Sequence, residues 1–232
     1  MLNLHNHTNY SDGRHSPRDI VEAAIKAGLT AVGISDHYRT TRVRSLQPGN
    51  FDEYIEHVRR LALHYKDKIR VLAGVEIDAS PERTEDLAYL PAGQLNKLDF
   101  ILFENVQDEE AGGMGLWELF DMRHELQPPV GLAHNDIVRN FAEIDHGVLI
   151  PVLETNKLFL ELCPSPRHSK LQRPQYRHSA DFFAKLKGTK VQLAFGTDTH
   201  ENLDDVGNID DAYAFVRENG LEKNLIDRMF GV

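Results

Sequence analysis

Seven short segments of this 232-residue chain are apolar at nearly every position, and amphipathic segments separate them. A strand with one face in water alternates apolar and polar residues, whereas a strand covered on both faces is apolar throughout. Covered strands that alternate with helices are typical of parallel β/α architecture. The strands are predicted at residues 1–4, 30–35, 69–77, 100–103, 130–133, 157–162 and 191–195.

The amphipathic segments carry signals that begin and end helices. In the first of them, Ser16 is suited to the N-cap and Pro17 to the first turn, and Gly28 ends the helix. Further helices are predicted at residues 51–65, 82–95, 116–126, 148–153, 180–186 and 210–230. The alternation predicts either a closed barrel or an open, doubly wound sheet. Because no repeat, linker-like run or low-complexity segment interrupts it, residues 1–232 are predicted to form a single domain.

Composition excludes several classes of protein. The 36 acidic and 26 basic side chains give a formal net charge of -10, whereas sequence-independent binding to nucleic acid or an anionic membrane needs an excess of Lys and Arg. No apolar run approaches the roughly 18 residues of a membrane span, and residues 1–8 are too polar for a signal peptide. The single cysteine, Cys163, rules out an internal disulfide bond and a cysteine-rich zinc site. We therefore expect a soluble, cytoplasmic protein.

Imidazole and carboxylate side chains follow five of the seven predicted strands. Because the carboxyl ends of parallel strands face the same side of the fold, these side chains are expected to meet in one cleft. So many ionisable groups would be costly to bury without metal ions, and zinc, manganese and iron accept mixed nitrogen and oxygen ligands. The sequence therefore predicts a metal centre. Its candidate ligands are His5, His7 and Asp12 after the first strand, His37 after the second, Glu76 at the end of the third, His134 after the fifth, and Asp198 and His200 after the seventh.

Each of these signals is weak when taken alone. Twelve histidines in 232 residues give about 0.6 His-x-His pairs by chance, from composition arithmetic. A lone His134 or Glu76 could equally be a buried side chain whose hydrogen bonds are satisfied within the core. The metal centre is inferred because five signals lie at the ends of five different strands.

The same residues form motifs in a fixed order along residues 3–200. They read His5-Asn6-His7-Thr8 with Ser11-Asp12-Gly13, Gly33-Ile34-Ser35-Asp36-His37, Gly74-Val75-Glu76, Ala133-His134, and Gly196-Thr197-Asp198-Thr199-His200. In this order they resemble the PHP (polymerase and histidinol phosphatase) superfamily. The resemblance implies an α/β fold, a distorted (β/α)7 barrel similar to a TIM barrel, with parallel strands, outer helices and two or three divalent ions of zinc, manganese or iron. It implies one ion on His5, His7, Glu76 and Asp198, a second on Asp12, His37 and His200, and a third on Glu76, His134 and one further ligand.

That further ligand departs from the pattern of the family. The family usually has a histidine after the strand that follows Asp99, whereas this chain reads Phe100-Ile101-Leu102-Phe103-Glu104-Asn105. Glu104 is a candidate oxygen ligand, which would favour manganese or iron over zinc at this position. Alternatively, the third site is weak or empty, and the protein binds two ions or is a degenerate domain.

The implied activity is phosphoester hydrolysis. Its transition state spreads negative charge over several oxygens, so metal ions stabilise it, and metal-bound hydroxide rather than a side chain is the expected nucleophile. A phosphate also needs cationic anchors. The candidates for substrate binding are Arg139, Arg167, His168 and Arg177. The segment 107–115, rich in glycine and acidic residues, is either a flexible surface loop or a lid.

The sequence therefore favours a hydrolase, a metal-dependent phosphoesterase that acts on a small phosphorylated substrate. The alternatives are a histidinol-phosphatase-type or short-oligonucleotide hydrolase, a metal-dependent amidohydrolase, and a metal-binding or regulatory domain without turnover. The amidohydrolase is disfavoured because no lysine ends a predicted strand. The basic loops hold few aromatic residues on which the bases of an extended nucleic-acid strand could stack. The pattern leaves the oligomeric state open.

Overall fold

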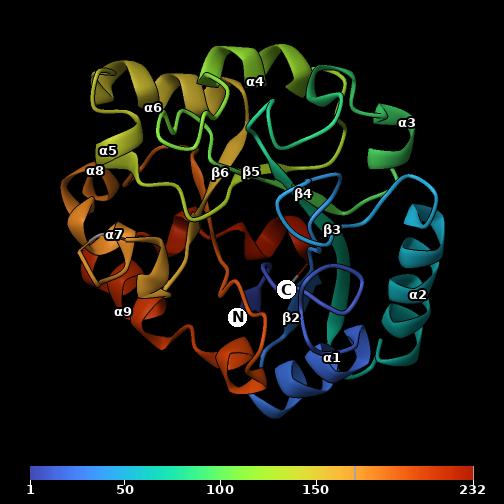
Figure 1. Ribbon diagram of the computed structural model, residues 1–232. Coiled ribbons are helices and arrows are strands. Elements are labelled where there is room, and N and C mark those ends of the chain that lie inside the picture. The colour runs from blue at the N-terminus through green and yellow to red at the C-terminus, as the bar shows by residue number, and fades with distance from the viewer. Residues whose placement is uncertain (170, 232) are drawn as a thin grey trace.

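Seven parallel strands form the centre of the molecule (Figure 1). The computed structural model describes residues 1–169 and 171–231. The strands lie in the sheet in the order in which they occur in the chain, which excludes a doubly wound sheet, where the order reverses at a switch point. They span Leu2–Asn3 (β1), Ala31–Ile34 (β2), Arg70–Asp78 (β3), Phe100–Glu104 (β4), Val130–Leu132 (β5), Leu158–Leu162 (β6) and Gln192–Phe195 (β7).

The first and last strands meet and close the barrel. Leu4 N donates a hydrogen bond to Phe195 O at 2.8 Å, and His7 N donates one to Thr199 O at 2.9 Å. Asn6 and Thr199 also form a parallel bridge. This seam sets residues 5–7 beside residues 198–200, and the expected (β/α)7 barrel is confirmed.

Helices surround the barrel on its outside, as Figure 1 shows. Among the described residues they are α1 (Pro17–Lys26), α2 (Phe51–His64), α3 (Ala92–Leu95), α4 (Leu116–Arg123), α5 (Ile137–Asn140), α6 (His146–Thr155), α7 (Gln175–His178), α8 (Ala180–Ala184) and α9 (Asp210–Asn219), with 3-10 turns at η1 (Leu87–Tyr89), η2 (Pro166–His168), η3 (Leu203–Gly207), η4 (Glu222–Asn224) and η5 (Ile226–Phe230). None of these helices is long and apolar enough to cross a membrane.

Two predicted helices are shorter than expected. The segment 82–95 forms only η1 and the four-residue α3, because Pro91 lies between them and lacks an N–H donor. Residues 210–230 were predicted to be helical on both sides of Gly220. The α-helix covers only Asp210–Asn219, because Gly220 adopts the left-handed conformation (φ 65°) that ends many helices, and the residues after it form the 3-10 turns η4 and η5. The predicted helix 148–153 is confirmed as α6, although Pro151 lies inside it.

Helix α1 follows directly from its sequence. The Ser16 side chain accepts a hydrogen bond from Asp19 N at 3.3 Å, and Asp19 Oδ2 accepts one from Ser16 N at 2.9 Å. This capping box satisfies two backbone donors that would otherwise lack a partner at the start of the helix. One apolar face, which includes Ile20, Val21 and Ala24, is buried, and this burial attaches the helix to the barrel.

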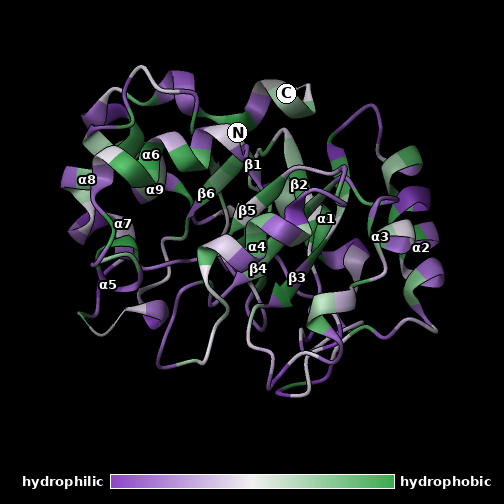
Figure 2. Ribbon diagram, turned by 90° about the horizontal axis from the view of Figure 1, so that it is seen from above, coloured by the Kyte–Doolittle hydropathy of each residue, from purple (hydrophilic) through white to green (hydrophobic). Residues whose placement is uncertain are grey.

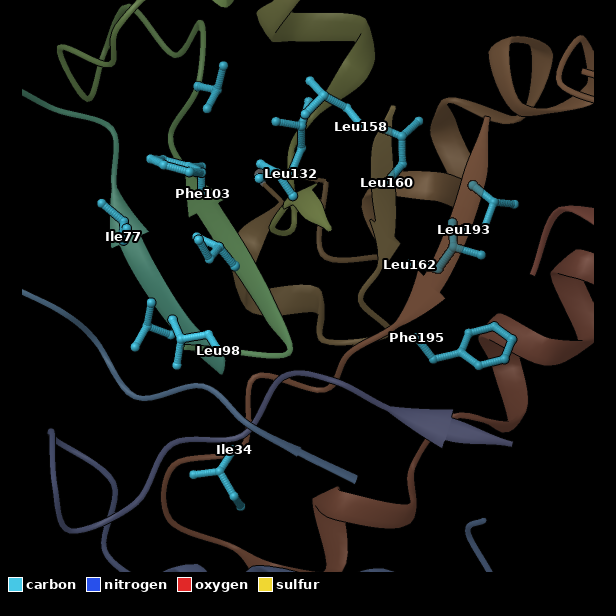
Figure 3. Close-up of a cluster of buried hydrophobic side chains, with 14 of the residues drawn as sticks. Ile34, Ile77, Leu98, Phe103, Leu132, Leu158, Leu160, Leu162, Leu193 and Phe195 are labelled. Atoms are coloured by element: carbon cyan, nitrogen blue, oxygen red, sulfur yellow. The ribbon is translucent and has the colours of Figure 1, made fainter. Parts of the chain in front are cut away.

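The larger part of the hydrophobic core lies between the strands and the surrounding helices. Side chains of successive strands, including Phe103, Leu132, Leu160 and Leu193, are buried and point outward from the barrel in Figure 3. Figure 2 shows hydrophobic residues on the central strands, whereas the outer helices carry both hydrophobic and hydrophilic residues. Both faces of the sheet are therefore covered, as the uniformly apolar strands predicted.

A smaller core fills the barrel interior, where two phenylalanine rings need glycine neighbours. A Cβ atom on Gly131 would lie 2.1 Å from Phe159 Cε2, and one on Gly74 would lie 2.3 Å from Phe100 Cζ. Carbon atoms in van der Waals contact are about 3.5–4.0 Å apart. The rings of Phe100 and Phe159 therefore occupy space that only a glycine on the facing strand leaves open.

The turn η5 closes one end of the barrel. Ile226 and Phe230 are buried within the inner core, and the ring centroids of Phe100 and Phe230 are 6.3 Å apart. Figure 2 shows both chain termini at this end, where β1 begins. The opposite end, at the C-terminal ends of the strands, is not covered by η5 and is where a functional site can form.

Candidate metal centre

All nine predicted metal ligands lie together at the C-terminal ends of the strands. A cavity of about 210 Å³ opens there. His5 and His7 are fully buried and contact Glu76 and Asp198, which belong to the cavity wall. The predicted ligands that line the cavity are Asp12, His37, Glu76, Glu104, His134, Asp198 and His200.

The innermost ligand atoms come from the seam of the barrel and from β3. His5 Nε2 and His7 Nε2 are 2.9 Å apart, and both lie 3.3 Å from Glu76 Oε2. Asp198 Oδ1 is 3.3 Å from His5 Nε2 and 3.1 Å from His7 Nε2. Four atoms that each lie about 2.0–2.1 Å from one tetrahedral zinc ion are about 3.3 Å from one another. The spacing of these four residues therefore suits one ion.

A second group lies nearer the mouth of the cavity. His7, Asp12, His37 and His200 each offer one ligand atom, and these atoms all lie within 4.8 Å of one another. Asp12 Oδ1 is 3.3 Å from His200 Nε2 and 3.8 Å from His37 Nε2. His7 faces this group with Nδ1, which is 3.8 Å from Asp12 Oδ1. The two ring nitrogens of His7 thus point at two neighbouring groups of ligands.

Two further groups of possible ligands share Glu76. One consists of His5, Glu76, His134 and Asp198, and the other of His37, Glu76 and Glu104. His134 Nε2 lies 3.0 Å from Glu76 Oε1, and His37, Glu76 and Glu104 form a group with ligand atoms within 4.8 Å. Burial and the neighbouring Glu76 raise the pKa of Glu104 to about 8. The side chain of Arg42 donates to this carboxyl, with Arg42 Nη2 3.2 Å from Glu104 Oε1.

Several buried ligand atoms have no hydrogen-bond partner among the described residues. They are Asp12 Oδ1, His37 Nδ1 and Glu76 Oε2, and all three side chains line the same cavity. A buried polar atom without a partner costs about 1–3 kcal/mol or more. Lone pairs that converge in this way fit divalent cations, which would satisfy them together.

The protonation states of the cluster couple metal binding to proton release. Burial opposes protonation of His7, but hydrogen bonds to Asp198 and Glu76 raise the pKa of its imidazole to about 10, so a cation would displace a proton from this ring. Burial opposes ionisation of Asp198, but His5 and hydrogen bonds from His168 and His7 hold the pKa of its carboxyl well below 3.8. Burial and the neighbouring His7 lower the pKa of His37 to about 3, so its imidazole is neutral. Ionised carboxylates and neutral imidazoles are the forms that divalent ions bind.

Residues 3–215 match the family model described as the PHP domain, and this span contains all nine candidate ligands. The chain belongs to the PHP domain family. The motifs that carried the resemblance in the sequence are thus the motifs that meet at the cavity.

The relatives of this PHP domain include proteins of different sizes. The DNA polymerase/3'-5' exonuclease PolX of Bacillus subtilis (strain 168) is 26% identical over 216 residues, which cover 88% of this chain and 35% of that protein. The probable histidinol-phosphatase of Schizosaccharomyces pombe is 32% identical over 84 residues, 31% of this chain and 28% of that protein. The matches thus cover about a third of the length of these curated relatives.

A solved structure shares the fold over nearly its whole length. The histidinol phosphate phosphatase of Lactococcus lactis, solved as a complex with zinc, L-histidinol and phosphate, matches with a TM-score of 0.66 at 18% identity. The match covers 95% of this chain and 94% of the other. At this level of identity the likeness establishes the barrel fold that the two chains have in common.

Glu161 supports the PHP site, although the sequence analysis did not select it. Its Oε1 atom lies 2.8 Å from His5 Nδ1, and its Oε2 atom accepts a hydrogen bond from His134 N at 2.6 Å. His134 has φ of 29°, a conformation that is strained for a residue with a side chain. A Cβ atom on Gly196 would lie 1.8 Å from Glu161 Oε1, so the glycine makes room for this carboxylate.

Asp36 organises the loop that carries the first ligands. Its Oδ1 atom accepts hydrogen bonds from Thr8 N at 2.7 Å and Ser11 N at 3.0 Å. The hydroxyl groups of Thr8 and Ser11 also donate to Asp36, at 2.7 and 2.6 Å. A carboxylate with four donors has little capacity left for a cation. Asp36 therefore shapes the loop between His7 and Asp12.

Two of the four predicted substrate-binding residues line the cavity. Arg139 donates from Nη2 to Asp108 Oδ1 at 2.6 Å and lies 3.1 Å from Glu110 Oε2. His168 Nε2 lies 3.0 Å from Asp198 Oδ2, and its ring stacks on that of His134 with centroids 3.9 Å apart. His168 therefore lines the cavity and directly contacts two candidate ligands, Asp198 and His134.

The other two predictions differ from what the structure shows. Arg167 Nη2 donates to the backbone oxygen of Asp198 at 3.0 Å, so it braces a candidate ligand and does not line the cavity. Arg177 lies in α7, which faces α9, and its guanidinium pairs with Asp211 at 2.7 Å and Glu218 at 2.6 Å. These carboxylates hold Arg177 away from the cavity. Arg42, which does line it, is not among the predicted substrate-binding residues.

Proposed function

We propose that this PHP domain is a metal-dependent phosphoesterase that hydrolyses a small phosphorylated molecule with two or three divalent ions of zinc, manganese or iron. The observation that carries the proposal is the group of buried ligand atoms without partners among the described residues, Asp12 Oδ1, His37 Nδ1 and Glu76 Oε2, which come from three separate strand ends and line one cavity. When bound, such ions acidify water and neutralise the charge of a phosphoester. The matching PHP structure from Lactococcus lactis, solved with zinc and phosphate, supports the same reading.

The residues around the cations would divide into three roles. His5, His7, Glu76 and Asp198 would hold one ion, while His37 and the remaining candidate ligands would hold others. Glu161 fixes the ring of His5 by its hydrogen bond, and such partners of metal ligands raise metal affinity.

The third role is substrate binding, which falls to Arg139 and His168. The planar guanidinium of Arg139 can donate two parallel hydrogen bonds to phosphate oxygens. Asp108 and Glu110 hold it beside the cavity until a phosphate replaces them. A cavity of about 210 Å³ suits a small molecule better than a polymer. This size, with the net charge of -10, favours a small substrate over an oligonucleotide.

Turnover of p-nitrophenyl phosphate, with added Mn²⁺ or Zn²⁺ and metal analysis of the same sample, tests the proposal. The wild type is expected to bind metal and hydrolyse the ester, because the ions and Arg139 together neutralise the phosphate. His7→Ala and Asp198→Ala are each expected to lose metal and turnover together, while Arg217→Ala, an exposed change in α9, alters neither. Full metal occupancy without hydrolysis of p-nitrophenyl phosphate or L-histidinol phosphate would instead indicate a binding domain. The cytoplasmic location stays a prediction from the sequence.

A further inference from the structure

A guanidinium group lies where the third group of candidate ligands would bind a cation. Arg42 Nη2 is 3.2 Å from Glu104 Oε1 and 3.4 Å from Glu104 Oε2, so one donor contacts both carboxylate oxygens. The Arg42 side chain lines the same cavity as His37 and Glu76. The other members of the third group are His37 and Glu76, and His37 Nδ1 lies 3.8 Å from Glu104 Oε1, the oxygen that Arg42 also contacts.

The loop that carries Arg42 is attached to the barrel on both sides. Tyr38 and Leu46 form a bridge across its base, and Thr40 forms a bridge with Thr84. The Ser45 hydroxyl donates to Thr40 O at 2.8 Å, and Arg42 N donates to the Thr40 hydroxyl at 3.3 Å. The backbone of the loop is thus positioned by several hydrogen bonds, and Arg42 reaches Glu104 from a defined point.

The Glu104 carboxylate can be neutralised by one nearby positive group, either the Arg42 guanidinium or a divalent ion, but not by both. Glu104 is 3% exposed and lies beside the buried Glu76 and Asp78, which disfavour its ionised form, so the carboxylate is stabilised only when a positive group lies beside it. A guanidinium has only donors and cannot act as a metal ligand. A divalent ion bound by Glu104 would share its two oxygens with the Arg42 guanidinium and would be repelled by it at close range.

We propose that Arg42 replaces the third divalent ion, so that this domain binds two metal ions and Arg42 supplies the positive charge beside Glu104. The inference rests on the proposed function and reduces the expected number of bound ions from two or three to two. Arg42 and the third ion then compete for one carboxylate, and removal of the guanidinium opens a third site of one imidazole and two carboxylates, an oxygen-rich set that suits Mn²⁺.

The test counts Mn²⁺ bound by metal-free protein, with isothermal titration and elemental analysis after gel filtration. We expect about two ions per chain for the wild type and about three for Arg42→Met, since methionine keeps an apolar stem and removes the charge. Arg42→Lys keeps a positive charge and is expected to stay at about two. Arg44→Ala removes an exposed arginine of the same loop and should match the wild type.

A double variant locates the additional ion. Arg42→Met with Glu104→Gln should return to about two ions, because an amide oxygen is a far weaker ligand than a carboxylate. Three ions on the wild type, or no gain for Arg42→Met in protein whose thermal unfolding and circular dichroism remain those of the wild type, would refute the inference and leave the proposed function standing. A wild type that binds no Mn²⁺ and no Zn²⁺ would refute both. A third ion bound to Arg42→Lys would refute the proposal that a positive charge beside Glu104 excludes that ion.

Discussion

Arg139 is a single residue whose positive charge is compensated by two carboxylates when no substrate is bound, while its position beside the cavity suits it to bind a phosphate. Its guanidinium contacts Asp108 and Glu110, both of which belong to the glycine-rich segment 107–115. Asp108 and Arg139 line the cavity together. A phosphate that enters would take over the donors that these carboxylates occupy, and it would thereby release the loop from Arg139.

Arg139→Ala is expected to raise KM for a phosphoester by about 10- to 100-fold, because hydrogen bonds between charged groups contribute about 1.5–3 kcal/mol. The metal content should not change, since no candidate ligand contacts this side chain in the described structure. Steady-state kinetics together with metal analysis checks both points, and Arg217→Ala serves as the surface control. Kinetics equal to those of the wild type would exclude Arg139 as a phosphate anchor.

The candidate ligands could be predicted residue by residue, but their supporting residues could not. Ligands at strand ends are visible because imidazoles and acids directly follow apolar runs. Glu161 lies inside such a run, in the sequence Leu158-Phe159-Leu160-Glu161-Leu162, and one acid in a strand covered on both faces is a signal that could have been used. Arg177 pairs with Asp211 and Glu218, and this placement could not be predicted because chain position does not reveal which way the short helix α7 faces.

At the scale of the elements, glycines on the inner face of the barrel decide which rings the interior can hold. The ring of Phe159 lies against Gly131 of the neighbouring strand β5, with which β6 pairs in parallel. The same arrangement recurs between Gly74 of β3 and Phe100 of β4. The large ring of one strand thus fills the space left by a missing side chain on the next.

Gly131→Ala is expected to destabilise the protein by about 1–3 kcal/mol, because the added methyl group overlaps the Phe159 ring and overpacks the interior. Urea unfolding followed by circular dichroism measures this change. Gly49→Ala is the matched control, since a Cβ atom there meets nothing within 4 Å. Combination of Gly131→Ala with Phe159→Leu should recover part of the loss. An unaltered unfolding midpoint for Gly131→Ala would show that the interior can shift to admit the methyl group.

The strands could be predicted because each lies in an apolar run, and the long helices because hydrophobic periodicity extends over several turns of each. Helices α5 and α7 contain four residues each and are too short to show a period. The segment 82–95 was predicted as a helix from its apolar content, but Pro91 divides it. Sequence periodicity therefore located the barrel and its main helices, while short turns depended on contacts that only the fold supplies.

At the scale of the whole molecule, the metal centre joins parts of the chain that are otherwise connected only through the barrel. Buried carboxylates such as Glu76 and Asp198 lie in one small volume with several imidazoles. In the folded state, cations bound there would compensate these charges, and in the unfolded state the ligands are dispersed. Metal binding is therefore coupled to the stability of the entire barrel.

Chelation of bound metal is expected to lower the melting temperature by about 5–10 °C, since ions present at 100 times their dissociation constant contribute about 2.7 kcal/mol and each kcal/mol shifts Tm by about 2–4 °C in a protein of this size. The difference should shrink as the pH falls from about 7 to 5, because protons compete with cations for the imidazole ligands: burial opposes protonation of His7, but Asp198 and Glu76 raise its pKa to about 10. Thermal unfolding with and without EDTA across this pH range measures both effects. Equal melting temperatures at pH 7 would contradict the coupling.

The seam between β1 and β7 also sets the order of events during synthesis. His5 and His7 leave the ribosome early, whereas their neighbours Asp198 and His200 are among the last parts of the barrel to be made. Until those residues emerge, the nascent chain offers only incomplete coordination at the two seam clusters, and a passing ion finds few of the contacts that would retain it. High-affinity binding of the proposed ions at the seam would therefore wait until the final strand docks, and a chain that has not finished folding would hold them only weakly.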